Sequence, residues 1–120
     1  MARYVDGFVI PIRKSKLKAY VRMAKLGAKL WKEYGALEYY ECVGDDLKAK
    51  FEHMPFTRLA KLKRGETVVF SFIVYKSRQH RDRVNARVMK DPRLNTPEMK
   101  QMPFDMKRFA WGGFKVLVSW

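Results

Sequence analysis

The sequence predicts an α+β fold in which two β-α-β units share one antiparallel sheet. The 120-residue chain is 48% hydrophobic and 14% aromatic, which fits a single packed domain covering residues 1–120. Two segments have apolar residues at helical spacing, and β-rich segments flank each of them. The resulting order, β-α-β followed by β-α-β, is the signature of the ferredoxin-like fold, whose helices cover one face of the sheet.

The first β-α-β unit covers residues 4–43. Residues 4–12 are β-rich, and Pro11 marks the end of that strand. Residues 14–34 are predicted to be helical, because apolar side chains recur every three or four positions at Leu17, Tyr20, Val21, Ala24, Ala28, Trp31 and Tyr34. Gly35 ends this helix, and residues 37–43 form a second strand that closes in a turn at Gly44.

The second unit begins after a basic excursion at residues 48–65, where we expect one helical turn around Leu59. Residues 67–75 contain no charge and form the third strand, and Ser77 caps a helix that runs to about Lys90. Residues 95–105 form another excursion, with a short turn of helix opened by Thr96. Residues 107–120 form the last strand, interrupted at residues 112–113 by two glycines.

The third strand is apolar on both sides. Alternation places Val68, Phe70, Phe72 and Val74 on one face and Val69, Ile73 and Tyr75 on the other. The helices cover only one face, and an exposed apolar face usually marks a partner surface. We therefore expect a homodimer in which two copies pack through their open sheet faces.

Charge and cysteine content indicate the kind of partner and the cellular compartment to expect. Twenty-six Lys and Arg residues face 12 Asp and Glu residues, which leaves a net charge of +14 and favours encounters with anions. The lone cysteine, Cys42, fits a reducing compartment, and no signal-peptide core or membrane-length apolar run is present. We expect a cytoplasmic protein with no membrane partner.

Both predicted helices begin with basic residues, although helix N-termini prefer negative charge. Arg13, Lys14 and Lys16 open the first helix, and Lys76, Arg78, His80 and Arg81 open the second. We expect the first and third strands to lie side by side and parallel, so that both helices begin at the same sheet edge. The basic residues would then gather there and bind an anion.

The chain resembles a bacterial family known only as domain of unknown function 1428. The resemblance is carried by Tyr4-Val-Asp-Gly-Phe-Val9, Trp31-Lys-Glu-Tyr-Gly-Ala-Leu-Glu38, Glu41-Cys-Val-Gly-Asp-Asp46, Gly65-Glu-Thr-Val-Val-Phe-Ser-Phe72, and residues 75–78, 80–85, 88–93, 102–105, 107–108 and 112–114. It implies a dimeric α+β barrel, in a superfamily of cofactor-free monooxygenases, haem enzymes, isomerases and ligand-sensing domains. The family has no assigned reaction. Residues 48–63, 95–101 and 109–111 depart from its pattern, which affects loop contacts and pocket shape.

Several side chains are candidates for a site. Asp6 and His80 are the candidates for proton transfer; a surface edge position and a solvated first helical turn are the plainer interpretations. Arg78, Arg81 and Arg108 are expected to hold an anion, and Asp105 to pair with one of these arginines. Tyr39 and Trp111, together with Tyr40 and Phe109, are expected to line a pocket, although aromatic residues in strands more often belong to a core.

No metal or cofactor is expected. Glu41, Asp45 and Asp46 offer oxygen ligands for a hard cation, but a strand followed by Gly-Asp-Asp is more often only a turn. No cysteine and histidine spacing suits zinc, and the arginines around His80 disfavour haem ligation.

Two functions remain open. The first is a homodimer that binds a small anionic or aromatic metabolite, with cofactor-free oxidoreductase or isomerase activity by fold analogy. The alternative is single-stranded RNA binding, because residues 70–75 echo the aromatic half of an RNA-recognition-motif strand. Against RNA, Val68 and Val69 replace the basic residue and glycine of that motif, and Asp6 is expected to add negative charge to the RNA face.

Overall fold

A computed structural model describes residues 2–48 and 53–120 of the chain. Its centre is a four-stranded sheet in which every pair of neighbouring strands is antiparallel. The strand order is β2-β3-β1-β4, which confirms the ferredoxin-like α+β prediction. The strands are β1 (Tyr4–Arg13), β2 (Glu38–Val43), β3 (Glu66–Tyr75) and β4 (Ala110–Lys115). Much of the 48–65 excursion is described, but residues 49–52 lie outside the described part.

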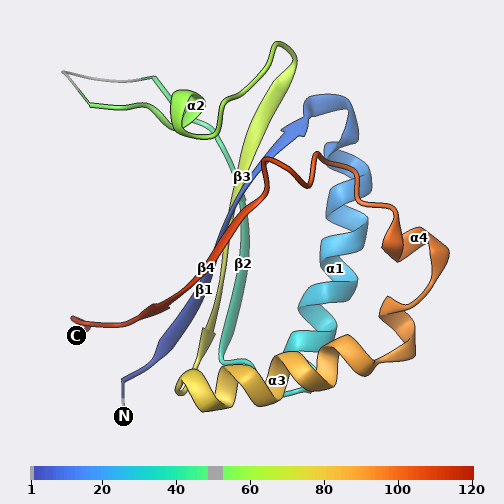
Figure 1. Cartoon of the computed structure of the whole chain (residues 1–120), viewed down its shortest axis with the longest axis vertical. Coiled ribbons are helices and arrows are strands. Elements are labelled where there is room, and N and C mark those ends of the chain that lie inside the picture. Colours follow the sequence, from blue (N-terminus) through green and yellow to red (C-terminus); the bar gives the residue numbers. More distant parts are fainter. Residues whose placement is uncertain (1, 49–52) are drawn as a thin grey trace.

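The helices form a layer on one side of the sheet, and a single short helix lies on the other (Figure 1). The covering layer contains α1 (Leu17–Glu33), α3 (Arg78–Lys90) and α4 (Pro97–Lys100), with 3₁₀ turns η1 (Lys14–Lys16) and η2 (Pro92–Leu94). The opposite side carries α2 (Phe56–Leu59), the helical turn expected around Leu59. The described residues include no helix long and apolar enough to span a bilayer.

Local signals position the helix starts as expected. The Ser77 side chain accepts a hydrogen bond from the His80 backbone N–H at 3.1 Å, which confirms Ser77 as the cap of α3. Thr96 caps α4 in the same way through the Met99 N–H. Tyr20, Gly27 and Leu30 are the buried residues of α1, whereas Val21 is 43% exposed.

The core lies between the sheet and α1 and α3, in two clusters. One cluster holds Leu30, Ile73, Tyr75, Val84 and Val88, and the other holds Ile10, Ile12, Tyr20 and Val69. Residues of β1 and β3 at every second position therefore point toward the helices. Asp6 lies an even number of residues before Ile10 and Ile12 on β1, so its carboxylate also points toward the helices.

The expectation of parallel central strands was wrong. Tyr4 pairs with Tyr75 and Arg13 pairs with Glu66, so β1 and β3 run in opposite directions. α1 therefore begins at one end of the sheet and α3 at the other, roughly 30 Å apart by strand rise. The basic residues at the two helix starts do not converge.

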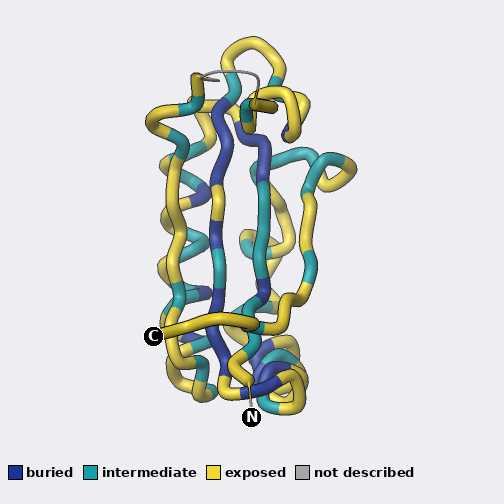
Figure 2. The backbone as a smooth tube through the Cα atoms, turned by 90° about the vertical axis from the view of Figure 1, so that its left-hand side faces the viewer, coloured by how far each residue is buried: buried dark blue, intermediate teal, exposed yellow. Residues whose placement is uncertain are grey.

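The open face of the sheet carries apolar and aromatic side chains, and Figure 2 looks onto this face. Phe70 is 44% exposed and Phe114 is 61% exposed, and Tyr40 packs against Phe72 with 5.0 Å between ring centroids. Phe56 of α2 contacts Phe70 on this face. The outer strands β2 and β4 are mostly exposed, whereas β1 and β3 are mostly covered (Figure 2).

β4 is shorter than the expected strand and is not interrupted by its glycines. It spans Ala110–Lys115, and Gly112 and Gly113 lie within the ladder opposite Gly7 and Asp6. A Cβ at residue 113 would collide with the Tyr4 ring, so glycine there permits close packing. The residues after Lys115 continue as an exposed tail.

Candidate functional site

A cavity of ≈ 580 Å³ lies between the sheet and the helical layer. Its size falls within the usual range for small-molecule sites. Its wall is largely apolar and aromatic, with contributions from all four strands and from α1, α3 and α4. The lining includes Phe8, Ile10, Met23, Trp31, Tyr39, Ile73, Met89, Met99, Met102, Phe104, Met106, Phe109 and Trp111.

A carboxylate held by two phenols lies on the β2 side of this cavity. Tyr20 donates to Glu41 Oε1 and Tyr39 donates to Glu41 Oε2, each at 2.6 Å. Burial raises the pKa of the Tyr20 and Tyr39 phenols, and their contacts with the Glu41 carboxylate raise it further. Both phenols therefore stay protonated and act as donors, and Glu41 keeps lone pairs available for a ligand.

A second polar cluster lies at the opposite end, around Asp6. The Arg81 guanidinium donates to Asp6 Oδ1 at 2.7 Å, and Asn85 Nδ2 donates to Asp6 Oδ2 at 3.3 Å. Asn85 Oδ1 in turn accepts from Trp31 Nε1 at 3.0 Å and from the Tyr75 hydroxyl at 2.9 Å. This network joins β1, β3, α1 and α3, so it fixes the end of the cavity.

Arg81 is itself buried within this cluster. Its guanidinium lies 4.9 Å from the centre of the Tyr4 ring and 5.9 Å from that of Trp111. Burial alone would lower the pKa of Arg81, but the charge of Asp6 and the hydrogen bond with Asp82 outweigh it and raise the pKa. Arg81 is thus committed to a protein carboxylate and offers little to a ligand anion.

The charge of the cavity favours a neutral aromatic ligand over an anion. Among the described lining residues, Asp6 and Glu41 are acidic and Lys100 is the only basic one. The charge of Asp6 is balanced by Arg81, so a ligand anion would mainly face the Glu41 carboxylate across an apolar space, which is unfavourable. A planar ring with a hydroxyl or amine donor suits the same wall, because Glu41 can accept its hydrogen bond.

The predicted site residues fall into three places. Asp6, Tyr39 and Trp111 line the cavity, as does Phe109. Tyr40 points to the open sheet face instead, because it alternates with Tyr39 along β2. The other predicted residues, His80, Arg78, Arg81 and Arg108, are absent from the described lining of this cavity.

The two proton-transfer candidates, Asp6 and His80, lie in different surroundings. His80 Nδ1 accepts from the Lys76 backbone N–H at 3.0 Å, and its ring packs edge-on against Tyr75. Burial lowers the pKa of His80, and the charges of Lys76 and Arg83 lower it further. His80 is therefore part of the start of α3, apart from the cavity.

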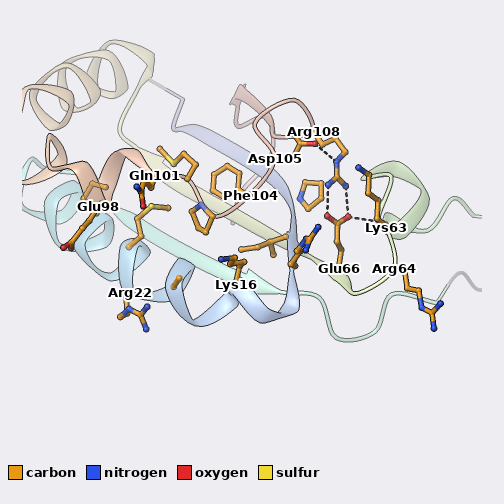
Figure 3. Close-up of a pocket in the computed structure, with 18 residues that line it drawn as sticks. Lys16, Arg22, Lys63, Arg64, Glu66, Glu98, Gln101, Phe104, Asp105 and Arg108 are labelled. Carbon is orange, nitrogen blue, oxygen red and sulfur yellow. Dashed lines mark hydrogen bonds and ion pairs between the residues drawn. The ribbon is translucent and has the colours of Figure 1, made fainter.

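The three predicted anion-binding arginines are also separated. Arg78 is exposed on α3 and Arg81 is ion-paired with Asp6. Arg108 lies in a different pocket, near the start of α1, where it bridges Glu66 and Asp105 (Figure 3). β3 and β4 are both antiparallel to β1, so α3 starts at one end of the sheet and Arg108, just before β4, lies at the other. The expected pairing of Asp105 with an arginine is confirmed, with Arg108 Nε donating to Asp105 Oδ2 at 3.1 Å.

The Glu66–Arg108 pair makes the stability of the protein sensitive to acid. Hydrogen bonds from Arg108 lower the pKa of Glu66 from its ordinary value of 4.5 to about 2. A carboxyl whose pKa is lower in the folded state than in the unfolded state stabilises the fold. This stabilisation is fully present above the unfolded-state pKa and is lost as the pH falls through the folded-state pKa. We expect Glu66→Gln to be less stable than the wild type at neutral pH, and the difference to shrink between pH 4.5 and about 2.

Urea denaturation at about pH 7 and about pH 3 tests this expectation. Glu98→Gln is the matched control, since Glu98 is exposed and forms no ion pair among the described residues. An equal response of the two variants to pH would contradict a role for the Glu66–Arg108 pair.

Several residues of the cavity were not predicted as site residues. Glu41 was considered only as a cation ligand, and Tyr20 and Trp31 only as core. Tyr39 was predicted to line a pocket, and residues two apart on a strand share a face. The same prediction could therefore have been made for Glu41. Asn85 carried no such signal, since its partners Asp6 and Tyr75 lie on separate strands.

The open face has aromatic rings on which bases could stack, but its centre lacks the cations expected of an RNA platform. Its central strand positions, which include Val5, Val9, Tyr40, Cys42, Phe70, Phe72, Ala110 and Phe114, are uncharged, and Glu38 adds a negative charge at one end of β2. Asp6 faces the helices, so the objection that it adds negative charge to the RNA face was wrong. Phosphate binding needs cations beside the stacking rings, and this face supplies none at its centre.

Comparisons with known proteins agree with the fold and assign no activity. The family model described as "Protein of unknown function (DUF1428)" matches residues 3–106. The uncharacterized protein YbaA of Escherichia coli K12 is 40% identical over 117 residues, which cover 98% of each chain, and YbaA of Shigella flexneri is equally similar. The crystal structure of a dimeric ferredoxin-like protein from an uncultured marine organism aligns over 99% of each chain with a TM-score of 0.63 at 12% identity. The chain therefore belongs to the DUF1428 family of proteins of unknown function.

Proposed function

We propose that this protein binds a small aromatic metabolite in the cavity between sheet and helices, and that it does so as a homodimer. The main support for the binding of an aromatic metabolite is the cavity itself. It combines a broad aromatic and methionine wall with one carboxylate, Glu41, whose oxygens are oriented by two phenols. Sites of this kind bind ligands through apolar contact and orient them through a few polar groups.

The same geometry suits proton abstraction. Glu41 can accept a proton from a bound phenol or from an acidified C–H group, and the hydrogen bonds from Tyr20 and Tyr39 hold its carboxylate in position for this step. Return of that proton to another carbon is an isomerisation, and reaction of the anion with dioxygen is a cofactor-free oxidation. Asp6, ion-paired with Arg81, would orient the far end of the ligand.

Filling the cavity should abolish ligand binding. Ala24 lines the cavity from α1, and Ala24→Leu places additional carbon atoms into the space that the ligand needs. We expect the thermal stabilisation by the best ligand of a panel of neutral phenols, anilines and aromatic carboxylates to disappear. Calorimetric affinity should fall by about tenfold or more, equivalent to ~1.4 kcal/mol.

The control is Ala86→Leu, because Ala86 is exposed on α3 and outside the described lining of the cavity. Glu41→Gln keeps the shape of the site but removes the charge, and it should weaken phenols more than methoxy analogues of the same ring. Equal ligand stabilisation in Ala24→Leu and Ala86→Leu would place the ligand elsewhere and overturn the proposal.

The dimer is supported by the uncovered aromatic surface of the open sheet face. Phe70 and Phe114 are largely exposed in one chain, and contiguous apolar faces of this kind usually mark interaction sites. The ferredoxin-like structural relative is described as dimeric, which points the same way. Sedimentation equilibrium on the whole protein measures the association directly, and a monomer at micromolar concentration would contradict this part of the proposal.

A further inference from the structure

A second pocket lies at the end of the sheet where β1 leads into α1 (Figure 3). Its volume is ≈ 1040 Å³. It is lined by the end of β1, the start of α1, the loop before β3, and the segment from α4 to Arg108. We call it the basic groove, because six basic and three acidic side chains line it: Arg13, Lys16, Arg22, Lys63, Arg64 and Arg108 against Glu66, Glu98 and Asp105.

Internal pairing removes most of the negative charge from the basic groove. Arg108 donates to both oxygens of Glu66, at 2.6 and 2.7 Å, and its Nε donates to Asp105. One arginine thus engages two of the three acids, leaving Glu98. In the part of the chain that the structure describes, the other five basic side chains form no hydrogen bond or ion pair.

The start of α1 adds to this positive potential. Its first turn contains no acidic residue, its N-cap position is Lys16, and no side chain accepts a hydrogen bond there. The positive end of the helix dipole is therefore opposed by no local negative charge. Lys16 lies within the groove, whereas Arg22 and Arg64 lie at its opposite ends and point away from it (Figure 3). The cations come from separate segments of the chain, so they are spread along the groove.

The other wall of the groove is apolar. Met99, Met102 and Phe104 line it, with the Gln101 amide beside them. A single phosphate would leave most of this wall and most of the cations without contacts. A chain of linked phosphates attached to an organic group would engage both sides.

From this arrangement we infer that the basic groove binds a small molecule carrying linked phosphates, such as a nucleoside triphosphate. The phosphates contact Arg13, Lys16 and Lys63, and the organic group lies against Phe104 and its neighbouring methionines. This site is distinct from the aromatic cavity, although the two share a wall that includes Met23 and Phe104. The inference does not depend on the proposed aromatic ligand.

Two variants with equal charge test the inference. The groove variant is Arg13→Ala/Lys16→Ala/Lys63→Ala, and the control variant is Lys25→Ala/Arg83→Ala/Arg87→Ala. The control residues are exposed on the helices and lie outside the described lining of both pockets. Both variants lose three positive charges, so a nonspecific effect of net charge would weaken them equally.

The probes are inorganic tripolyphosphate, adenosine triphosphate, adenosine monophosphate and a short single-stranded oligonucleotide, titrated by calorimetry into the full-length protein. We expect tripolyphosphate and adenosine triphosphate to bind more tightly than the monophosphate, and the groove variant to weaken both by about tenfold or more relative to the control variant. Tighter binding of adenosine triphosphate than of tripolyphosphate would identify a nucleotide. Equal binding would identify the phosphate chain alone as the ligand.

Ala24→Leu should leave these affinities unchanged, which separates this inference from the aromatic cavity. Equal weakening of the groove and control variants would overturn the inference. It would also be overturned if only the oligonucleotide bound and its affinity increased with length, since that is the behaviour of a dispersed charge. Circular dichroism and a thermal melt of each variant confirm that the fold is retained.

Discussion

Replacing Asp6 with alanine is expected to lower the free energy of unfolding by about 3–5 kcal/mol, the usual effect of breaking a buried ion pair from one side. The Asp6 residue is 1% exposed, and the Arg81 side chain is 10% exposed. Loss of the carboxylate leaves the Arg81 guanidinium without its main partner in a site shielded from water. Asn85 also loses an acceptor, so the network that joins β1 to α3 is broken on two sides.

Urea denaturation measures this loss, and an unchanged m-value verifies that the unfolding transition is comparable. Glu33→Ala is the control, because Glu33 pairs with Arg93 at the surface and exposed pairs contribute little. The double variant Asp6→Leu/Arg81→Met should be more stable than Asp6→Ala, since an apolar pair leaves no buried charge. If Asp6→Ala were as stable as Glu33→Ala, the buried pair would not be a stabilising element.

Introducing a carboxylate at Phe70 is expected to dissociate the proposed homodimer. Phe70 lies near the middle of β3 on the open face, beside Phe72 at 5.9 Å between ring centroids. A face-to-face dimer would bury this position, and an unpaired carboxylate there is strongly unfavourable. We expect Phe70→Asp to raise the dimer dissociation constant by roughly 100-fold or more, which corresponds to ~2.7 kcal/mol.

Val21→Asp is a closely matched control, because Val21 is 43% exposed and Phe70 is 44% exposed. Val21 lies on α1, in the layer on the opposite side of the sheet. Sedimentation equilibrium should show a dimer for Val21→Asp and a monomer for Phe70→Asp, with similar circular dichroism spectra. Dissociation of both variants to the same extent, or of neither, would show that the open sheet face is not the interface.

The periodicity of apolar residues in the sequence was sufficient to predict most of the fold. The alternation of Phe70, Phe72 and Val74 against Val69 and Ile73 predicted the two faces of β3, and the structure confirms it. Capping chemistry predicted the start of α3 at Ser77. These signals are local, because side-chain direction in a strand or helix depends on the spacing of neighbouring residues.

The direction of β3 relative to β1 depends on how the strands are connected, and the prediction that the two are parallel was wrong. β1 and β2 run the same way because α1 crosses between them, and β3 reverses direction after β2, so β1 and β3 must be antiparallel. The predicted gathering of Arg13 and Lys16 with Arg78 and Arg81 failed for this reason. The two basic helix starts lie at opposite ends of the sheet.

The sequence by itself determined the family, the α+β architecture and the apolar character of both sheet faces. Only the tertiary structure decided which charges remain available. Arg81 is occupied by Asp6, 75 residues away in the chain, and Arg108 is occupied by Glu66, 42 residues away. Glu41 meets Tyr20 across the gap between β2 and α1. Such pairings depend on how distant elements pack together, so they cannot be predicted from the spacing of residues along one element.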